Sequence, residues 1–221
     1  MNFTDSKYKE FRRIYPVPRL SYSLYKYWIK NDWYEVWNYL AGFQYYKSSA
    51  MTLGSEGHEW IQKNGVPKWL AEMVDNEKVH IEEKLTWGID IDNPSKVLRD
   101  EEKELEYCVV IIPDVRSEFT YIVDWKFGGI AGYEKQLSQY SWIGKKIFGE
   151  DKYNRNIVIG VEAIRDENGC IKELRKVKSH EYETNPKFVK EWDLVFDEMN
   201  NSIRRGLDNG EFDDFLKFNY F

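Results

Sequence analysis

Residues 111–127 read Ile-Ile-Pro-Asp-Val-Arg-Ser-Glu-Phe-Thr-Tyr-Ile-Val-Asp-Trp-Lys-Phe, and this stretch decides the fold. Two apolar, β-branched runs, Tyr107–Val115 and Phe119–Phe127, flank the polar turn 116–118. Such runs around a short polar turn predict two paired strands. The turn should bring Asp114 back to Asp124, ten residues further along the chain.

The second run carries two charges among apolar residues. Because strand side chains alternate, Asp124 and Lys126 should share one face of the sheet while Trp125 points to the other. Buried charges are costly unless they are paired or bind a metal ion. Two carboxylates could hold Mg²⁺ or Mn²⁺, and Lys126 could orient or help deprotonate a water molecule and stabilise charge on a phosphate. Taken alone, Asp124 and Lys126 also fit an ordinary salt bridge at a strand end.

The bulk composition predicts one folded domain spanning residues 1–221. Of the 221 residues, 42% are hydrophobic and 17% aromatic, which suits a large core. The net charge of -6 argues against a protein that coats nucleic acid by electrostatics alone, although a local basic groove stays compatible with it.

The two cysteines, Cys108 and Cys170, are expected to be reduced, buried thiols. They are too few for an iron–sulfur cluster or a cysteine zinc site. The sequence has neither a signal peptide nor an apolar run of transmembrane length, so we expect a cytoplasmic protein with no membrane partner.

The remaining elements alternate between helical and strand patterns, which predicts an α/β fold with a central mixed sheet flanked by helices. The last fifteen residues are expected to be peripheral. The expected elements are a long aromatic helix from Ser21 or Ser23, a helix from Ser48–Ser49 to Gly65–Pro67, a short helix from Lys68 to about Val74, a strand Val79–Leu85, a charged connector Ile89–Glu104, a helix from Gly132 to Phe148, a hairpin of Asn156–Arg165 and Cys170–Lys178, and a helix from Asn185 to Arg205.

Pro113-Asp114, about ten residues, then Asp124-x-Lys126, followed by Gly128-Gly129 and a helix, resembles the PD-(D/E)XK nuclease superfamily. Three further stretches resemble motifs of its RecB-like exonuclease branch. They are Gly54-Ser55-Glu56-Gly57-His58-Glu59, Gln136-Leu137-Ser138-Gln139-Tyr140, and Arg19-Leu20-Ser21-Tyr22-Ser23. The resemblance covers about residues 19–145, and residues 155–206 match only as a strand pair and a closing helix.

The resemblance implies a restriction-endonuclease-like core and a deoxyribonuclease that needs Mg²⁺ or Mn²⁺. The implied catalytic residues are Asp114, Asp124 and Lys126, and the implied metal ligands are His58, Asp114, Asp124 and the backbone carbonyl of Trp125. Gln136 and Tyr140, which share a helix face, would contact DNA. We expect an exonuclease of recombination, repair or phage DNA processing, from a bacterium or phage, acting on single strands or duplex ends. A helicase, a recombinase or a second copy of the chain could be its protein partner.

Several alternatives stay open. Gly88-Ile89-Asp90 also resembles the family's G-x-D stretch, but Asp90 would need an insertion before Asp124, so Asp114 is preferred. Glu82 or Glu83 could be an outer-shell acid. A DNA-binding or scaffold module without catalysis, or a structure-specific endonuclease, could use the same fold. No Walker A motif is present, and no nucleotide cofactor is expected.

Overall fold

The structure is a computed structural model that describes residues 19–41, 49–88, 108–127, 129–149 and 152–220. Its residues group into two compact units. One unit comprises residues 1–45, 86–111 and 190–221, and the other comprises residues 46–85 and 112–189. The prediction of a single domain over the whole chain stays a prediction. Asp90 and the connector 89–104 lie outside the described residues.

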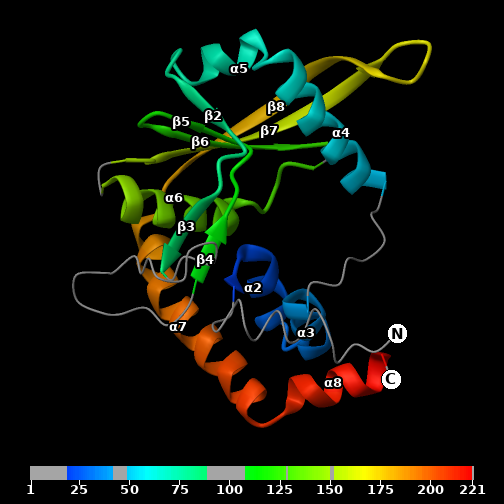
Figure 1. Cartoon of the computed structure of the whole chain (residues 1–221). Helices are drawn as coiled ribbons and strands as arrows, with labels where there is room; N and C mark the ends of the chain where they lie inside the picture. The colour runs from blue at the N-terminus through cyan, green and yellow to red at the C-terminus, as the bar shows by residue number, and fades with distance from the viewer. Residues whose placement is uncertain (1–18, 42–48, 89–107, 128, 150–151, 221) are drawn as a thin grey trace. The chain divides into compact units, whose positions relative to one another are not determined.

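The second unit is built on a five-stranded mixed sheet in the order β2-β5-β6-β7-β8. β6 and β7 run parallel, and the other neighbouring strands run antiparallel. Helices α4 and α5 lie on one face of this sheet and α6 lies on the other (Figure 1). The bounds are α4 (Ser49–Asn64), α5 (Lys68–Met73), β2 (Val79–Ile81), β5 (Val115–Ser117), β6 (Tyr121–Lys126), α6 (Glu134–Phe148), β7 (Arg155–Arg165) and β8 (Ile171–Glu183).

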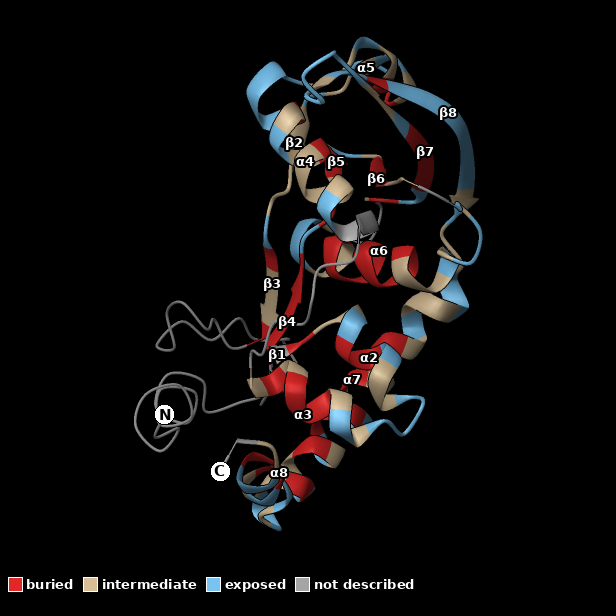
Figure 2. Ribbon diagram, turned by 90° about the vertical axis from the view of Figure 1, so that its right-hand side faces the viewer, coloured by how far each residue is buried: buried red, intermediate tan, exposed pale blue. Residues whose placement is uncertain are grey.

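Alternation along β6 divides its side chains between the two faces of the sheet. Tyr121, Val123 and Trp125 pack into one apolar cluster with Ile61 of α4 and Leu70 of α5. The intervening residues of β6 therefore face α6. The neighbouring strand β7 is buried along most of its first half, as the red segment in Figure 2 shows. A parallel β6–β7 pair needs a crossover connection, and α6 provides it.

Two of the predicted strands are wrong in extent, because each divides between two sheets. The run 107–115 breaks after β4 (Cys108–Ile111), and β5 begins only at Val115. Pro113 has no N–H to donate to a ladder, so the strand cannot continue through it. The run 79–85 divides in the same way into β2 and β3 (Leu85–Gly88), with Glu82 between them at a φ of 48°.

The first unit contains the small sheet β1-β4-β3, in which β1 (Arg19–Leu20) pairs in parallel with β4. Ser21 caps α2 (Tyr22–Trp28), as predicted, by accepting the Leu24 N–H at 3.2 Å. The single long helix expected here is wrong, because Asn31 adopts a φ of 57° and α3 (Trp33–Ala41) starts anew.

The C-terminal residues are not peripheral. Most of α7 (Pro186–Asp208) and all of α8 (Glu211–Tyr220) belong to the first unit. Phe212 and Leu216 of α8 are buried, and Phe212 lies against Trp37 with ring centroids 5.5 Å apart. Apolar side chains at helical spacing therefore extend the core into α8, as far as Leu216.

Cys108 is buried, as predicted, whereas the prediction is wrong for Cys170, which lies beside the β7–β8 turn and is exposed. A hairpin turn places its residues at the surface, and this overrides the preference of cysteine for burial. None of the described helices combines the length and the apolar character needed to cross a lipid bilayer. The described architecture is α/β, with a mixed sheet flanked by helices, as the sequence predicted.

Candidate active site

The predicted catalytic residues meet at one end of the five-stranded sheet. β5 and β6 pair through Val115 and Val123, so Asp114 and Asp124, each the next residue outward, lie opposite one another. The Asp114 Oδ2 atom accepts the Trp125 backbone N–H at 2.7 Å. The tight β5–β6 hairpin therefore brings together two carboxylates that are ten residues apart in the sequence.

The surroundings of Asp114 shift its pKa strongly. Its side chain is only 13% exposed. Burial and the nearby negative charge of Asp124 raise the pKa of Asp114 well above its usual value, although Lys126 opposes the shift. Two carboxylates this close repel each other when both are ionised, and a cation between them would relieve that repulsion.

Lys126 neutralises one of the two carboxylates. Its Nζ atom lies 2.5 Å from Asp124 Oδ2, and it also lies 4.9 Å from the centre of the Tyr133 ring. Burial alone would lower the pKa of Lys126, but attraction to Asp124 and Asp114 outweighs burial and raises it. Lys126 is therefore a protonated ammonium at neutral pH. This state suits charge stabilisation better than proton abstraction.

His58 on α4 joins the site from the other face of the sheet. Its Nε2 atom lies 3.5 Å from Asp114 Oδ1 and accepts the Trp125 indole N–H at 3.2 Å. The imidazole also lies beside the indole ring, with centroids 5.4 Å apart. The structure thus brings His58, Asp114, Asp124 and Lys126 together, as the sequence motifs predicted.

The open choice between Glu82 and Glu83 now has a structural answer. Glu82 contacts His58 Nδ1 through Oε1. Glu83 instead accepts a hydrogen bond at 2.6 Å from the buried guanidinium of Arg116. Of the two carboxylates, Glu82 is therefore the one that contacts His58.

Gln136 and Tyr140 share a face of α6, as their spacing predicted. The Gln136 Nε2 atom donates to the Tyr140 hydroxyl at 2.7 Å. Tyr140 is only 7% exposed, whereas Gln136 is partly exposed. A ligand on this face would therefore meet Gln136, with Tyr140 fixing the orientation of its amide.

Sequence reasoning missed Glu77, which precedes β2 and holds the β5–β6 turn. Its Oε2 atom accepts hydrogen bonds from Ser117 Oγ at 2.6 Å, from Phe119 N at 3.0 Å and from Thr120 N at 3.2 Å. The carboxylate thereby satisfies donors of the turn that brings Asp114 opposite Asp124. Its partners lie about forty positions away, so no local pattern could reveal it.

The donor chemistry of the site fits a hard divalent cation in part. Two atoms that each lie about 2.1 Å from one ion can be 3.5 Å apart, the distance between His58 Nε2 and Asp114 Oδ1. In the structure, however, the His58 Nε2 lone pair accepts the Trp125 indole N–H, and Asp124 forms an ion pair with Lys126. Accordingly, no three His, Cys, Asp or Glu side chains of the described residues form a ready-made metal cluster. His58 and Asp114 are the donors best placed to hold a cation, and the Trp125 carbonyl stays a predicted ligand.

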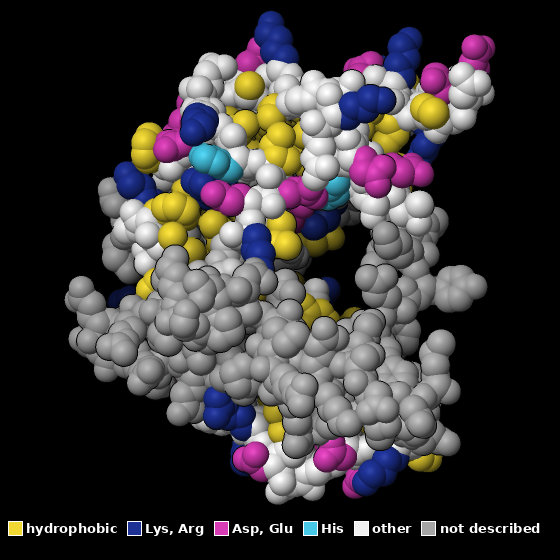
Figure 3. All heavy atoms as spheres, viewed as in Figure 1, with side chains coloured by type: hydrophobic (Ala, Val, Ile, Leu, Met, Phe, Trp, Pro, Cys, Tyr) yellow, Lys and Arg dark blue, Asp and Glu magenta, His cyan; other side chains and the backbone are white. Residues whose placement is uncertain are grey.

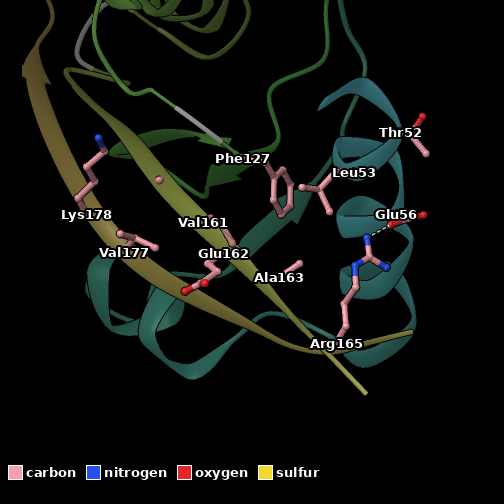
Figure 4. A pocket seen from close by; sticks show the side chains of 11 residues that line it. Thr52, Leu53, Glu56, Phe127, Val161, Glu162, Ala163, Arg165, Val177 and Lys178 are labelled. Carbon is pink, nitrogen blue, oxygen red and sulfur yellow. Dashed lines mark hydrogen bonds and ion pairs between the residues drawn. The ribbon is translucent and has the colours of Figure 1, made fainter. Parts of the chain in front are cut away.

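A separate open pocket of about 790 Å³ lies between α4 and the β7–β8 pair. In Figure 4, Leu53 of α4 lies beside Phe127, which follows β6, and the Glu56–Arg165 ion pair lies at the edge of the pocket. None of the predicted site residues lines it. In the view of Figure 3, acidic and basic side chains intermingle over the described surface.

No protein-family model matches the sequence, and no curated protein matches it. Among solved structures, the chain is similar to a crystal structure from Eubacterium rectale named "Putative exonuclease". The sequences are 16% identical and the TM-score is 0.49, over 96% of this chain and 88% of that chain. With identity and structural similarity this low, function has to be argued from the side chains of the site.

Proposed function

We propose that this chain is a divalent-metal-dependent deoxyribonuclease, and specifically an exonuclease. The observation that carries the proposal is the meeting of Asp114, Asp124 and Lys126 at one sheet end, with His58 3.5 Å from Asp114. A structural salt bridge explains Lys126 and Asp124, but it does not explain a second carboxylate, only 13% exposed, and an imidazole beside them.

The reaction would be hydrolysis of a phosphodiester bond, in which a water oxygen bonds to phosphorus and one ester P–O bond breaks. A bound Mg²⁺ or Mn²⁺ ion supplies polarisation of the phosphate and a more acidic water. His58 and Asp114 would hold the ion, with Asp124 beside them. The Lys126 ammonium would stabilise the negative charge that develops on the phosphate oxygens.

The test is incubation of the purified full chain with linear and circular DNA, single- and double-stranded, with Mg²⁺, with Mn²⁺ or with a chelator. An exonuclease degrades the linear substrates only and stops on chelation. Cleavage of circles would identify an endonuclease instead. If all substrates stay intact with either metal, the proposed activity is wrong.

A catalytically idle DNA-binding module is the second candidate. The closed contacts of His58 with Trp125 and of Asp124 with Lys126 favour it, because both would have to open for a metal to bind. Calorimetric titration with Mn²⁺ separates the two. An enzyme binds the ion, and the affinity falls in Asp114→Asn, whereas an idle site binds Mn²⁺ poorly.

A further inference from the structure

Glu82 lies at the point where the predicted strand 79–85 divides, and its backbone is unusual. Its φ of 48° is in the left-handed region, which residues other than glycine rarely adopt. The Glu82 N–H donates to the Asp114 carbonyl at 3.1 Å and so ties this conformation to the catalytic turn. The Glu82 carboxylate contacts α4.

Both oxygens of this carboxylate are used on α4. Oε1 contacts His58 Nδ1, and Oε2 accepts from Gln62 Nε2, four residues further along the same helix. Residues four apart share a helix face, so one carboxylate reaches both. With the backbone fixed at one end and two contacts at the other, Glu82 has a defined orientation relative to the imidazole.

The partners of His58 also define which ring nitrogen carries the proton. A carboxylate only accepts hydrogen bonds and an indole N–H only donates them. Because Nε2 accepts the indole N–H, the neutral imidazole carries its proton on Nδ1, which lies within ion-pair distance of Glu82 Oε1. The Nε2 lone pair lies on the side of the ring where Trp125 Nε1 and Asp114 Oδ1 are found.

We infer that Glu82 is a positioning residue for His58: it fixes the Nδ1–H tautomer and directs the Nε2 lone pair toward Asp114, where a divalent cation would be held. The bound cation in this inference rests on the proposed function, whereas the tautomer of His58 does not. A histidine that binds a metal commonly donates its other N–H to a carboxylate, and loss of that carboxylate commonly weakens metal affinity or activity about 10–100-fold.

The first test is made on the metal-free full chain and needs no activity. Long-range ¹H–¹⁵N spectra near pH 8 report the tautomer of each of the three histidines, and His58→Ala assigns the signal of His58. The wild type should show the Nδ1–H tautomer. Glu82→Gly removes the carboxylate while keeping a residue that tolerates positive φ, and it should lose this preference. An Nε2–H tautomer in the wild type would overturn the inference.

The second test measures Mn²⁺ affinity by calorimetry. Glu82→Gly should weaken binding about 10–100-fold, and Glu82→Gln, whose carbonyl can still accept the Nδ1–H, should restore part of the loss. Glu83→Gln is the matched control, because Glu83 contacts Arg116 rather than His58. It should bind like the wild type.

A double-mutant cycle shows whether Glu82 acts through His58. In the His58→Ala background, Glu82→Gly should cause no further loss of Mn²⁺ affinity. An equal loss in both backgrounds, or full affinity in Glu82→Gly, would refute the positioning role while leaving the proposed nuclease intact. A wild type that binds no Mn²⁺ would refute the proposed function and the metal-directing role together, whereas the tautomer result would still stand.

Discussion

Asp114 Oδ2 accepts the backbone N–H of Trp125 at 2.7 Å, so the first carboxylate of the site is fixed to the strand that carries the second. The same carboxyl has a raised pKa because of its burial and the nearby Asp124. The structure therefore holds Asp114 where its ionisation is unfavourable unless a cation is present.

This arrangement predicts a pH dependence of the metal-free protein. The unfolded pKa of Asp is about 3.9. When the pKa in the folded protein is higher, the free energy of unfolding falls as the pH rises from the unfolded pKa to the folded pKa. Asp114→Asn removes this loss, and the amide oxygen can still accept the Trp125 N–H. Urea unfolding in chelator should show the variant gaining stability over the wild type as the pH rises from 4 to 8. Parallel pH profiles would contradict the prediction.

Lys126→Ala should reduce DNA cleavage at least about 100-fold, the scale of losing one charge-stabilising donor, with the circular dichroism spectrum unchanged. Asp124→Asn should reduce cleavage and weaken Mn²⁺ binding as well. Exposed Lys68, whose partner is Glu72 on α5, provides the control, and Lys68→Ala should cleave like the wild type. Wild-type turnover by Lys126→Ala would remove Lys126 from the mechanism.

Two glycines on α4 should respond oppositely to alanine. A Cβ on Gly57 would lie 2.3 Å from the Phe127 ring, whereas one on Gly54 meets nothing within 4 Å. Gly54→Ala should stabilise the helix by about 0.5–1 kcal/mol. Gly57→Ala should destabilise the protein by about 1–3 kcal/mol, the cost of overpacking. Thermal unfolding of the two variants compares them, and equal melting temperatures would show that Phe127 moves aside freely.

Glu77 should make the stability depend on pH in the acid range. Burial alone would raise the pKa of Glu77, but hydrogen bonds from Ser117, Thr120 and Phe119 outweigh it and lower the pKa. A lowered folded pKa stabilises the protein above the unfolded pKa of about 4.3, and this contribution is lost as the pH falls through the folded value. Glu77→Gln should cost about 1.5–3 kcal/mol at pH 7 and much less below pH 4.

Denaturant unfolding across that range checks the prediction for Glu77. Exposed Glu72 offers a matched control, and Glu72→Gln should change stability by less than about 0.5 kcal/mol at every pH. A Glu77→Gln cost that stays constant with pH would assign its effect to packing instead of charge.

Tyr140→Phe removes the hydroxyl that holds the Gln136 amide while keeping the buried ring. If Gln136 contacts a DNA phosphate, this variant should bind DNA a few-fold more weakly, and Gln136→Ala should show a similar or larger loss. Fluorescence anisotropy with labelled linear DNA in Ca²⁺ measures both affinities. Unchanged binding by both variants would exclude this face of α6 from the DNA path.

The sequence by itself predicted the class of the fold and the meeting of Asp114 with Asp124 and Lys126. Alternation along 121–126 separated Asp124 and Lys126 from Trp125, and the polar turn 116–118 predicted that Asp114 returns to Asp124. Both relationships depend on local periodicity and turn chemistry, which a strand imposes whatever surrounds it.

Only the tertiary structure decided which residues from distant parts of the sequence contact this site. Glu82 and Glu83 are equivalent in the sequence, but in the structure Glu82, at a left-handed φ, contacts His58, whereas Glu83 contacts Arg116. Glu77 reaches the β5–β6 turn across about forty residues. Such contacts follow from the packing of whole elements, and no periodicity within a single segment encodes them.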